Sequence, residues 1–401
     1  MKILFICRFL PHPKVRSSGG QDKYHYIASL SEQHEVSLIS FVTPEQGRAV
    51  AEMRSICEQV VTVRYRPHAL LPRLWRAWWR LLMPRVYGRV FSLRYRACLR
   101  DLLTRMHFDV AVVDGVMVKY GNSMRGVKRV LDEVDIYSVV AHHLYRNEKR
   151  HLPRLYLLFD WLRTLAFELH YAASYDGILV RSEKDRMILQ DHLPHQRFAI
   201  ISPWFEGLTG LQSIAPRRPP GNSLLFVGAM SFPSNVEAVL YFAHRVLPLI
   251  QQRIPDVNFY IVGNSPSSDV RSLDEMEGVI VTGEVESLRP YYEKCAVNVV
   301  PLLTGGGIIV KTLNGMAAGR PTVTTPLGNS GAGARDGRDL LVAGETAEAF
   351  AQAVTSLLSD EKLWARIAQS GQQFVRQTYD WPNIIQNLTG FLESVAQDHF
   401  Q

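Results

Sequence analysis

The sequence is poor in cysteine and has no long apolar run, and each absence excludes a class of protein. Its four cysteines, Cys7, Cys57, Cys98 and Cys295, show no CxxC or CxxH spacing, so we expect neither a zinc module nor a disulfide framework. No window reaches ~18 uninterrupted apolar residues, which argues against a membrane-spanning helix. The apolar run in the opening segment MKILFICRFLP is too short for a signal peptide, so we interpret it as a first strand.

Acidic side chains are scarce in one half of the chain. Residues 1–200 contain 31 Lys and Arg against 19 Asp and Glu, whereas the remaining residues contain 14 against 19. The two halves therefore carry net charges of +12 and −5. Such asymmetry indicates that the amino-terminal half meets an anionic surface, for which nucleic acid and anionic lipid are both candidates.

What the sequence does have is a regular alternation of short β-branched runs with helix-length amphipathic segments. Because 47% of its 401 residues are hydrophobic, the chain is long and apolar enough for two or three folded domains. The strand-like runs are KILFI, HEVSLISF, VVTVRY, DVAVVD, KRVLDEV, DGILVRS and FAIIS, then SLLFVG, VNFYIVG, GVIVTG, AVNVVPL and RPTVTTP. Alternation of this kind predicts an α/β protein with two doubly wound parallel sheets.

Composition also predicts the domain boundaries. Residues 207–222, GLTGLQSIAPRRPPGN, are rich in Gly and Pro and are interpreted as a linker. They separate a first domain at 1–206 from a second at 223–379. Residues 380–401 begin with Asp-Trp-Pro and continue with an apolar stripe, which predicts a final helix that must pack on something.

Glycines end several strands of the second domain. Gly228, Gly263 and Gly283 each follow an apolar run, and Gly305, Gly306 and Gly307 follow AVNVVPLL. In open α/β sheets ligands bind at the carboxyl ends of strands, where glycine turns and helix amino termini favour anions. We therefore expect these glycines on one rim.

The stretch PLLTGGGIIVKTLNGMAAGRPTVTTPLG is the most informative one. It predicts a strand end, a glycine turn, a helix from about Ile308 to Ala318 and a new strand. Lys311 and Asn314 are three residues apart on that helix, so a cation and an amide could reach one ligand. The alternative is that the glycines form a plain loop and both side chains are solvated.

These residues carry a family resemblance. The segment from 222 to about 375 resembles the nucleotide-sugar-binding lobe of glycosyltransferase family 4, in particular bacterial exopolysaccharide-biosynthesis members. The matching motifs are FVGAMSFPSN, FYIVGNSP, VIVTGEV and GGG-x3-K-x2-NGMAAGRPTV. The first half resembles the family more loosely, in PHPKVRSSGGQDKYHYIASLSEQHEVSLISF, FDVAVVD and LVRSEKDRMIL.

The resemblance implies a GT-B fold, in which two Rossmann-like domains face a cleft and the last helix crosses back to the first domain. It implies a retaining, metal-independent transferase without a cofactor, using a UDP- or GDP-sugar as donor. The residues implied in donor binding are Gly228, Gly263, Gly283, Glu284, Gly305, Gly306, Gly307, Lys311 and Asn314. Gly19 and Gly20 resemble the glycine turn on the acceptor side.

The sequence departs from the family at two carboxylates. Family members carry two Glu residues around the glycine turn, where this chain has Gly306 and Asn314. An amide oxygen at Asn314 could still accept a hydrogen bond from a ribose hydroxyl, at a cost of ~1–2 kcal/mol in donor affinity. Neutralisation of the diphosphate would then depend on Lys311 and backbone amides.

Asp114, which ends the run DVAVVD, is the candidate catalytic residue of the first domain. A carboxylate at a strand end could accept a proton from an acceptor hydroxyl or orient it. The alternative is that Asp114 caps the following loop or helix. Asp132, Asp135, His142 and His143 follow another strand and are weaker candidates, and at most one of the two adjacent histidines can face the site.

Arginine and aromatic residues gather in two segments of the first half. Residues 64–105 contain eleven Arg and one acid, Asp101, interleaved with Trp75, Trp78, Trp79, Tyr87, Phe91 and Tyr95. A second such segment is RNEKRHLPRLYLLFDWLRTL at 146–165. Arg and Trp on amphipathic helices suit a lipid headgroup interface. Since no nucleic-acid module is recognisable, we favour a membrane surface over nucleic acid. The alternative is that the rings are buried and the Arg side chains solvated.

The sequence thus leaves two main hypotheses, with an enzyme of a different reaction on the same architecture, such as a nucleotide-sugar epimerase, as a distant third. One is a glycosyltransferase on the inner face of the membrane, moving a sugar to a lipid-linked saccharide for an exopolysaccharide or biofilm matrix. The other is a catalytically weakened nucleotide-sugar-binding or scaffold protein of the same machinery, favoured by the missing carboxylates.

Overall fold

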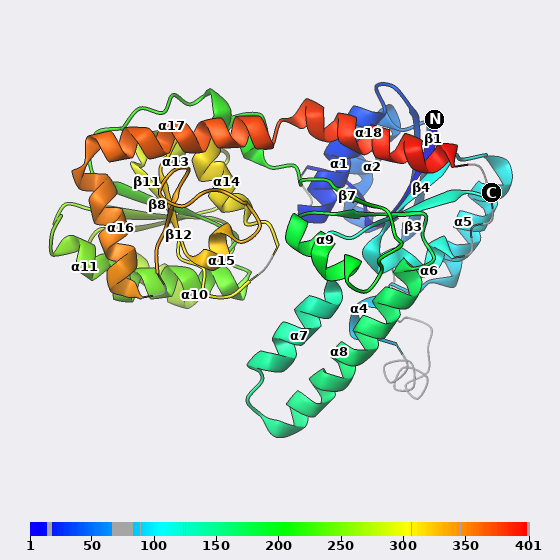
Figure 1. Ribbon diagram of the computed structural model, residues 1–401, viewed down its shortest axis with the longest axis horizontal. Helices are drawn as coiled ribbons and strands as arrows, with labels where there is room; N and C mark the ends of the chain where they lie inside the picture. Colours follow the sequence, from blue (N-terminus) through cyan, green and yellow to red (C-terminus); the bar gives the residue numbers. More distant parts are fainter. Residues whose placement is uncertain are drawn as a thin grey trace. The chain divides into compact units, whose positions relative to one another are not determined.

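The computed structural model describes residues 1–13, 18–65, 83–88, 90–122, 124, 126–305, 307–344 and 346–398. The chain divides into two compact units (Figure 1). Unit 1 consists of Met1–Trp204 with Pro382–Gln401, and unit 2 consists of Phe205–Trp381. Each unit is built on its own parallel sheet with helices on both faces, which confirms the predicted α/β class.

Unit 1 contains a seven-stranded sheet with the order β3-β2-β1-β4-β5-β6-β7. Its strands are β1 (Lys2–Phe9), β2 (Glu35–Val42), β3 (Gln59–Arg64), β4 (Val110–Asp114), β5 (Lys128–Asp132), β6 (Gly177–Val180) and β7 (Phe198–Ile200). Five consecutive residues of β1, Ile3–Cys7, are buried, as expected of a central parallel strand covered on both faces. The register sets Ile3 opposite Val36 on one side and Val110 on the other.

The helices of unit 1 are α1 (Ser18–Leu30), α2 (Gly47–Ile56), α4 (Arg85–Gly88), α5 (Leu93–Arg105), α6 (Val118–Gly121), α7 (Tyr137–Asn147), α8 (His151–Ala172), α9 (Glu183–Gln190) and α18 (Trp381–Gln397). Helix α9 begins within the motif LVRSEKDRMIL, at the point where the Ser182 hydroxyl accepts the N–H of Asp185 at 3.2 Å. The last helix, α18, packs on unit 1: a side chain at Gly177 would collide with the Phe391 ring, 2.7 Å away. The predicted return of the final helix to the first domain is confirmed.

Unit 2 contains a six-stranded sheet with the order β10-β9-β8-β11-β12-β13. Its strands are β8 (Ser223–Val227), β9 (Asn258–Val262), β10 (Val279–Gly283), β11 (Val297–Val300), β12 (Thr322–Thr324) and β13 (Leu341–Val342). Its helices are α10 (Pro233–Tyr241), α11 (Leu247–Gln251), α12 (Ser268–Arg271), α13 (Arg289–Lys294), α14 (Val310–Ala317), α15 (Pro326–Asn329), α16 (Ala347–Ser359) and α17 (Glu361–Thr378). Between α10 and α11 the chain continues as a π-helical turn, Phe242–Val246.

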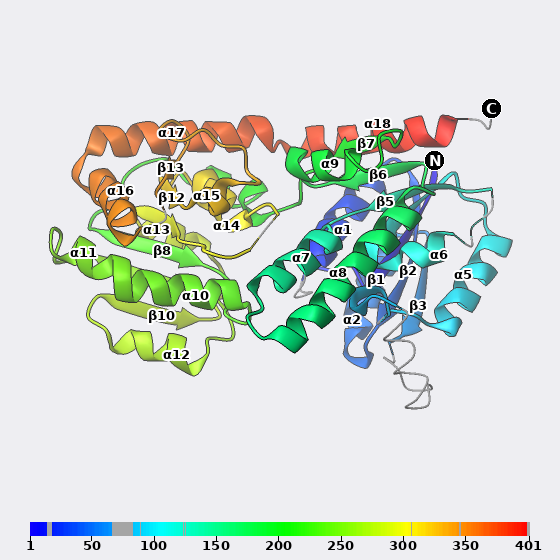
Figure 2. The same ribbon diagram turned by 60° about the horizontal axis from the view of Figure 1, so that its bottom comes forward.

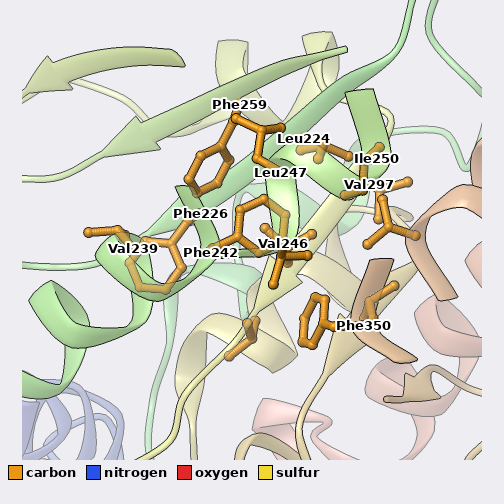
Figure 3. Packing of buried hydrophobic residues seen from close by; sticks show 14 of the residues in the cluster. Leu224, Phe226, Val239, Phe242, Val246, Leu247, Ile250, Phe259, Val297 and Phe350 are labelled. Carbon is orange, nitrogen blue, oxygen red and sulfur yellow. The ribbon is translucent and has the colours of Figure 1, made fainter. Parts of the chain in front are cut away.

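One apolar cluster fills the space between this sheet and the helices on one of its faces. Figure 3 shows Phe226, Phe242, Phe259 and Phe350 within it, and none of these side chains is more than 1% exposed. The Phe242 and Phe259 rings lie 4.5 Å apart. This core fixes the strands whose carboxyl ends carry the glycines discussed above.

Three local expectations need correction. Residues 207–222 are not an exposed linker, since Leu211 and Ile214 are buried in the core of unit 2. The helix expected from Ile308 begins at Val310 and ends where Gly319 takes a φ of 62°. Gly19 and Gly20 lie in the first turn of α1 instead of a turn before it.

The basic and aromatic segment at 64–105 is only partly described. Trp75, Trp78 and Trp79 lie outside the described residues. Tyr87 and Tyr95, expected to face a lipid interface, are instead 3% and 0% exposed. The Tyr95 hydroxyl donates to the carbonyl of Ile39 at 2.9 Å, so this ring belongs to the core. No helix among the described residues is long and apolar enough to span a membrane.

Candidate functional site

In unit 2 the strand order reverses between β8 and β11. We locate the candidate site at the carboxyl ends of these two strands. Helices α10 and α14 follow these two strands and run back along opposite faces of the sheet. Neither helix has a side-chain cap at its amino terminus, where Phe232 and Ile309 occupy the N-cap positions. Two positive helix ends therefore approach one edge of the sheet, which favours an anionic ligand there.

Lys311 lies at this point, in the first turn of α14. Its Nζ donates to Oδ1 of Asn235, in the first turn of α10, at 2.9 Å, and lies 5.5 Å from the centre of the Phe226 ring. Burial lowers the pKa of Lys311 to about 8. An anion placed at the helix ends would restore the charge that burial disfavours.

The glycines at the strand ends allow two backbone segments, at Gly228 and Gly263, to approach each other closely beside Lys311. A Cβ atom at Gly263 would lie 1.8 Å from the carbonyl oxygen of Gly228, and one at Gly228 would lie 2.8 Å from Nδ2 of Asn235. The same amide Nδ2 donates to the carbonyl of Ala229 at 2.8 Å. No side chain fits at Gly228 or Gly263 without moving the edge of the sheet.

The glycine turn after β11 needs glycine for its backbone conformation. Gly305 and Gly307 have φ angles of 139° and 70°, which L side chains rarely adopt. Beside the turn, the hydroxyl of Thr304 donates to Oε2 of Glu237 on α10 at 2.6 Å. Gly306 lies outside the described residues.

Asn314 is placed differently from the expectation. Its Oδ1 accepts the backbone N–H of Gly207 at 2.8 Å, and the side chain is only 6% exposed. The oxygen that the sequence assigned to a ribose hydroxyl thus holds the entry segment of unit 2 in place. Lys311 and Asn314 share a helix, but their polar groups meet different partners.

The remaining donor-side candidates lie at the end of β10. Gly283 ends that strand with a φ of 73°, and its carbonyl accepts the N–H of Gly263 at 3.1 Å. Glu284 follows as an exposed residue. Strands β9 and β10 lie beside β8 on the same side of the reversal, so these residues flank the Lys311 position.

Asp114 occupies the equivalent reversal point of unit 1, between β1 and β4. One of its oxygens accepts the backbone N–H of Arg8, at the end of β1, at 3.3 Å, and lies 3.6 Å from Nζ of Lys23. Although Asp114 is the N-cap residue of the next turn, its side chain makes no capping hydrogen bond. The capping alternative is therefore wrong, and the carboxylate is held at the strand ends by Lys23 and Arg8.

Sequence reasoning named Asp132 only as a weaker candidate and missed the buried cations Lys23 and Arg181 that surround it. Asp132, at the end of β5, pairs with Lys23 at 3.0 Å and with Arg181 at 2.7 Å, and all three side chains are at least 96% buried. Burial opposes ionisation of Asp132, but Arg181 and Lys23 outweigh it and lower its pKa. Nearby, burial raises the pKa of Asp22 to about 7. The available signal was Arg181 directly after the apolar run GILV.

The other acceptor-side candidates are dispersed. The His142 ring packs against Trp161 of α8, with ring centres 4.4 Å apart and the ring planes tilted by 38°, and His143 is exposed on α7. Gly20 is buried in α1, the helix that carries Lys23. Of these candidates, Gly19 and Gly20 lie on the helix that reaches Asp114, and neither histidine contacts it among the described residues.

Residues 221–360 match the family described as glycosyl transferases group 1. This match identifies residues 221–360 as a glycosyl transferases group 1 domain, and the two parallel sheets give the chain a GT-B fold. The resemblance stated for the second half of the sequence is confirmed.

Three similar proteins are informative. An uncharacterized 44.6 kDa protein in the cps region of Klebsiella pneumoniae is 21% identical over 314 residues, covering 74% of this chain and 77% of that protein. A phosphatidyl-myo-inositol mannosyltransferase of Mycobacterium tuberculosis is 30% identical over 197 residues, or 44% of this chain and 48% of the enzyme. The structure of Anabaena HepE in complex with UDP has a TM-score of 0.69 at 14% identity, covering 98% of this chain and 100% of HepE.

Proposed function

We propose that the protein is a retaining, metal-independent glycosyltransferase that moves a hexose from a nucleoside diphosphate sugar to a saccharide acceptor. The single observation that carries this proposal is Lys311, held by Asn235 between two uncapped helix ends at the strand reversal of unit 2. The lysine and the helix ends neutralise the donor diphosphate, so the leaving group needs no metal ion. HepE, which has a similar fold, is known in complex with UDP, and we propose UDP- or GDP-sugars as donors here.

We assign the remaining donor contacts to residues around Lys311. Gly228, Gly263, Gly283, Gly305 and Gly307 would bring backbone amides close to the phosphates. Asn314 contributes its Nδ2 group to a ribose hydroxyl, since its oxygen already accepts the Gly207 N–H. Glu284 is exposed at the same edge and available to the sugar or base.

On the acceptor side we assign Asp114 as the group that receives or orients the acceptor hydroxyl. Lys23 places its Nζ 3.6 Å from the Asp114 carboxylate and so helps to hold that group at the strand ends, where an acceptor hydroxyl would reach it. Gly19 and Gly20 lie in the first turn of α1, the helix that carries Lys23.

We further propose that the acceptor is lipid-linked and belongs to exopolysaccharide assembly, with the protein on the inner face of the membrane. The similarity to a protein of a cps region and to a phosphatidyl-myo-inositol mannosyltransferase supports a surface-glycan substrate with a lipid anchor. The excess of basic residues in the first half supports contact with anionic lipid.

Incubating the purified protein with labelled UDP- and GDP-hexoses and membrane lipid extract tests this function. We expect label to enter the lipid fraction, with the anomeric configuration of the donor retained and with no loss of rate in EDTA. Inverted product would contradict the retaining mechanism, and loss of rate in EDTA would contradict metal independence.

A second candidate is a binding or scaffold protein that no longer transfers sugar. The observation that favours this candidate concerns Asn314. Its side chain is an amide instead of a carboxylate, and its oxygen already accepts the N–H of Gly207. This candidate predicts nucleotide-sugar binding without any transfer or hydrolysis in the same assay.

A further inference from the structure

Exposed apolar side chains concentrate on one element of unit 1, the pair of helices α7 and α8. These helices pack against each other as a hairpin that extends beyond the sheet of their unit (Figures 1 and 2). Of the fourteen large hydrophobic residues that are exposed in the described part of the chain, seven belong to this hairpin: Val140, Leu144, Leu152, Leu155, Tyr156, Phe159 and Leu162. Such a concentration on a two-helix element marks an interaction surface.

Helix α8 is amphipathic, but its apolar side chains are exposed and polar side chains are buried, which is the opposite of an ordinary surface helix. Its exposed stripe is apolar and follows helical spacing, with Leu152 at 81%, Leu155 at 63% and Phe159 at 47% exposed. Its buried residues lie one turn apart, and three of the four, Asp160, Thr164 and Glu168, are polar, while the fourth is Ala172. An ordinary surface helix would point these two stripes the other way.

The buried polar stripe fixes this orientation. Asp160 accepts the backbone N–H of Arg85 at 3.3 Å and a guanidinium N–H of Arg163 at 2.8 Å. Glu168 accepts the backbone N–H of Tyr137, where α7 begins, at 2.7 Å. Rotating α8 to hide its leucines would break these bonds and leave buried carboxylates unpaired, so the apolar stripe is held outward.

The tip of the hairpin is basic. Arg146, Lys149, Arg150 and Arg154 are exposed, and the one acidic residue between 136 and 159, Glu148, is paired with Arg150 at 3.1 Å. The amino terminus of α8 lies here too, without a side-chain cap. The tip therefore adds a positive helix end to an excess of cationic side chains.

We propose that the α7–α8 hairpin docks on an anionic lipid surface. This inference rests on the proposed membrane association and names the element responsible for it. The stripe from Leu152 to Leu162 covers about 15 Å of helix at 1.5 Å per residue, and it sinks to the acyl boundary while the basic tip meets lipid phosphates. Charge complementarity favours lipid as the partner. The apolar stripe suits the acyl chains of a bilayer, and the four cationic side chains at its end suit the anionic headgroups above them.

Flotation with phosphatidylcholine vesicles, with and without phosphatidylglycerol, tests the proposal on the full chain. The stripe variant combines Leu155→Gln with Phe159→Gln, and its control is Met187→Gln, an exposed apolar residue on α9 at 57% exposure. The tip variant combines Arg146→Glu with Lys149→Glu, and its control is Arg253→Glu with Lys362→Glu, both exposed in unit 2. All changed residues are exposed, so the thermal midpoint should stay near that of the wild type.

We expect the wild type to bind only vesicles with phosphatidylglycerol, more weakly at high salt. The stripe and tip variants should each lower the partition coefficient about tenfold or more, and the controls less than about twofold. Wild-type binding by both hairpin variants would overturn the proposal and assign binding to another surface. If the wild type forms a dimer that the stripe variant abolishes, and the wild type does not bind vesicles, the proposal is overturned and the stripe is a protein–protein interface.

Failure here and failure of the proposed enzyme are distinguishable. Nucleotide binding is measured on the same preparations without lipid. Unchanged UDP or GDP binding together with absent vesicle binding overturns only the hairpin and the membrane association. Vesicle binding that depends on the hairpin, in a protein without nucleotide binding, supports the hairpin and overturns the donor site.

Discussion

At the residue scale, the charge of Lys311 controls how the site responds to pH. Burial lowers its pKa to about 8, so near neutrality most molecules still carry the ammonium, and above pH 8 most do not. A bound diphosphate stabilises the charged form and raises the pKa of the complex. Ligand binding then takes up a proton above pH 8, and affinity falls as pH rises through that value.

The first prediction follows from this sign. Between pH 7 and pH 9 the affinity for UDP or GDP should fall about tenfold, which titration calorimetry measures directly. Lys311→Arg should lose most of this dependence, because a guanidinium stays charged throughout. The same pH profile in both proteins would show that Lys311 does not contact the phosphates.

The second prediction concerns Asp114. Asp114→Asn should lower the transfer rate about a hundredfold or more and leave nucleotide affinity within about twofold, because the residue belongs to the acceptor side. The matched control is Asp109→Asn, whose carboxylate accepts the N–H of Lys2 at an exposed position. Wild-type turnover by Asp114→Asn would remove Asp114 from the mechanism.

The third prediction separates the structural role of Asn314 from ligand binding. Asn314→Leu leaves the buried N–H of Gly207 without its acceptor, so the free energy of unfolding should fall by about 1–3 kcal/mol in urea denaturation. Asn222→Ala, which removes an exposed amide paired with Asp256, should cost less than about 1 kcal/mol. Equal stability of the two variants would contradict the role given to Asn314.

The sequence predicted single site residues better than their partners. Lys311 stood out because it follows a glycine turn at a helix start. Its partner Asn235 is 76 positions away and becomes relevant only when α10 and α14 begin side by side. Lys23 and Arg181 escaped notice since charged residues are expected to face water, whereas here they are buried around Asp132.

At the scale of elements, the close approach of the ends of β8 and β9 fixes the backbone at the edge of the unit 2 sheet where we propose that the donor binds. The fourth prediction is that Gly263→Ala pushes Gly228 away, because the new Cβ would lie 1.8 Å from its carbonyl oxygen. We expect a loss of about 1–3 kcal/mol in stability and a clear loss of nucleotide affinity. Gly210→Ala is the control, since no atom lies within 4 Å of its added Cβ. Unchanged nucleotide affinity in Gly263→Ala would contradict the site at this edge.

Elements with strong periodicity were predictable, and short or inverted ones were not. The strands of unit 1, strands β8 to β12 of unit 2, α14 and α18 followed from apolar runs and helix signals. Strand β13 has only two residues, Leu341 and Val342, too few to show alternation. The orientation of α8 could not be predicted either, because both of its stripes occur in the sequence and only the contacts of Asp160 and Glu168 decide which is buried.

At the scale of the whole molecule, the two units carry different charges and separate cores. The excess of basic residues lies in the chain that forms unit 1, and the match to glycosyl transferases group 1 lies in unit 2. The gross organisation followed from the sequence because it depends on patterns summed over many residues. The point where the chain leaves unit 1, between Trp204 and Phe205, did not, since residues 207–222 pack instead of linking.

Thermal unfolding with and without millimolar UDP and GDP tests the central claim most directly, because a ligand that binds the native state raises the midpoint. We predict that one of the two nucleotides raises the midpoint of the wild type and has a much smaller effect on Lys311→Ala. No stabilisation of the wild type by either nucleotide, or an equal shift in Lys311→Ala, would contradict a donor site built around Lys311.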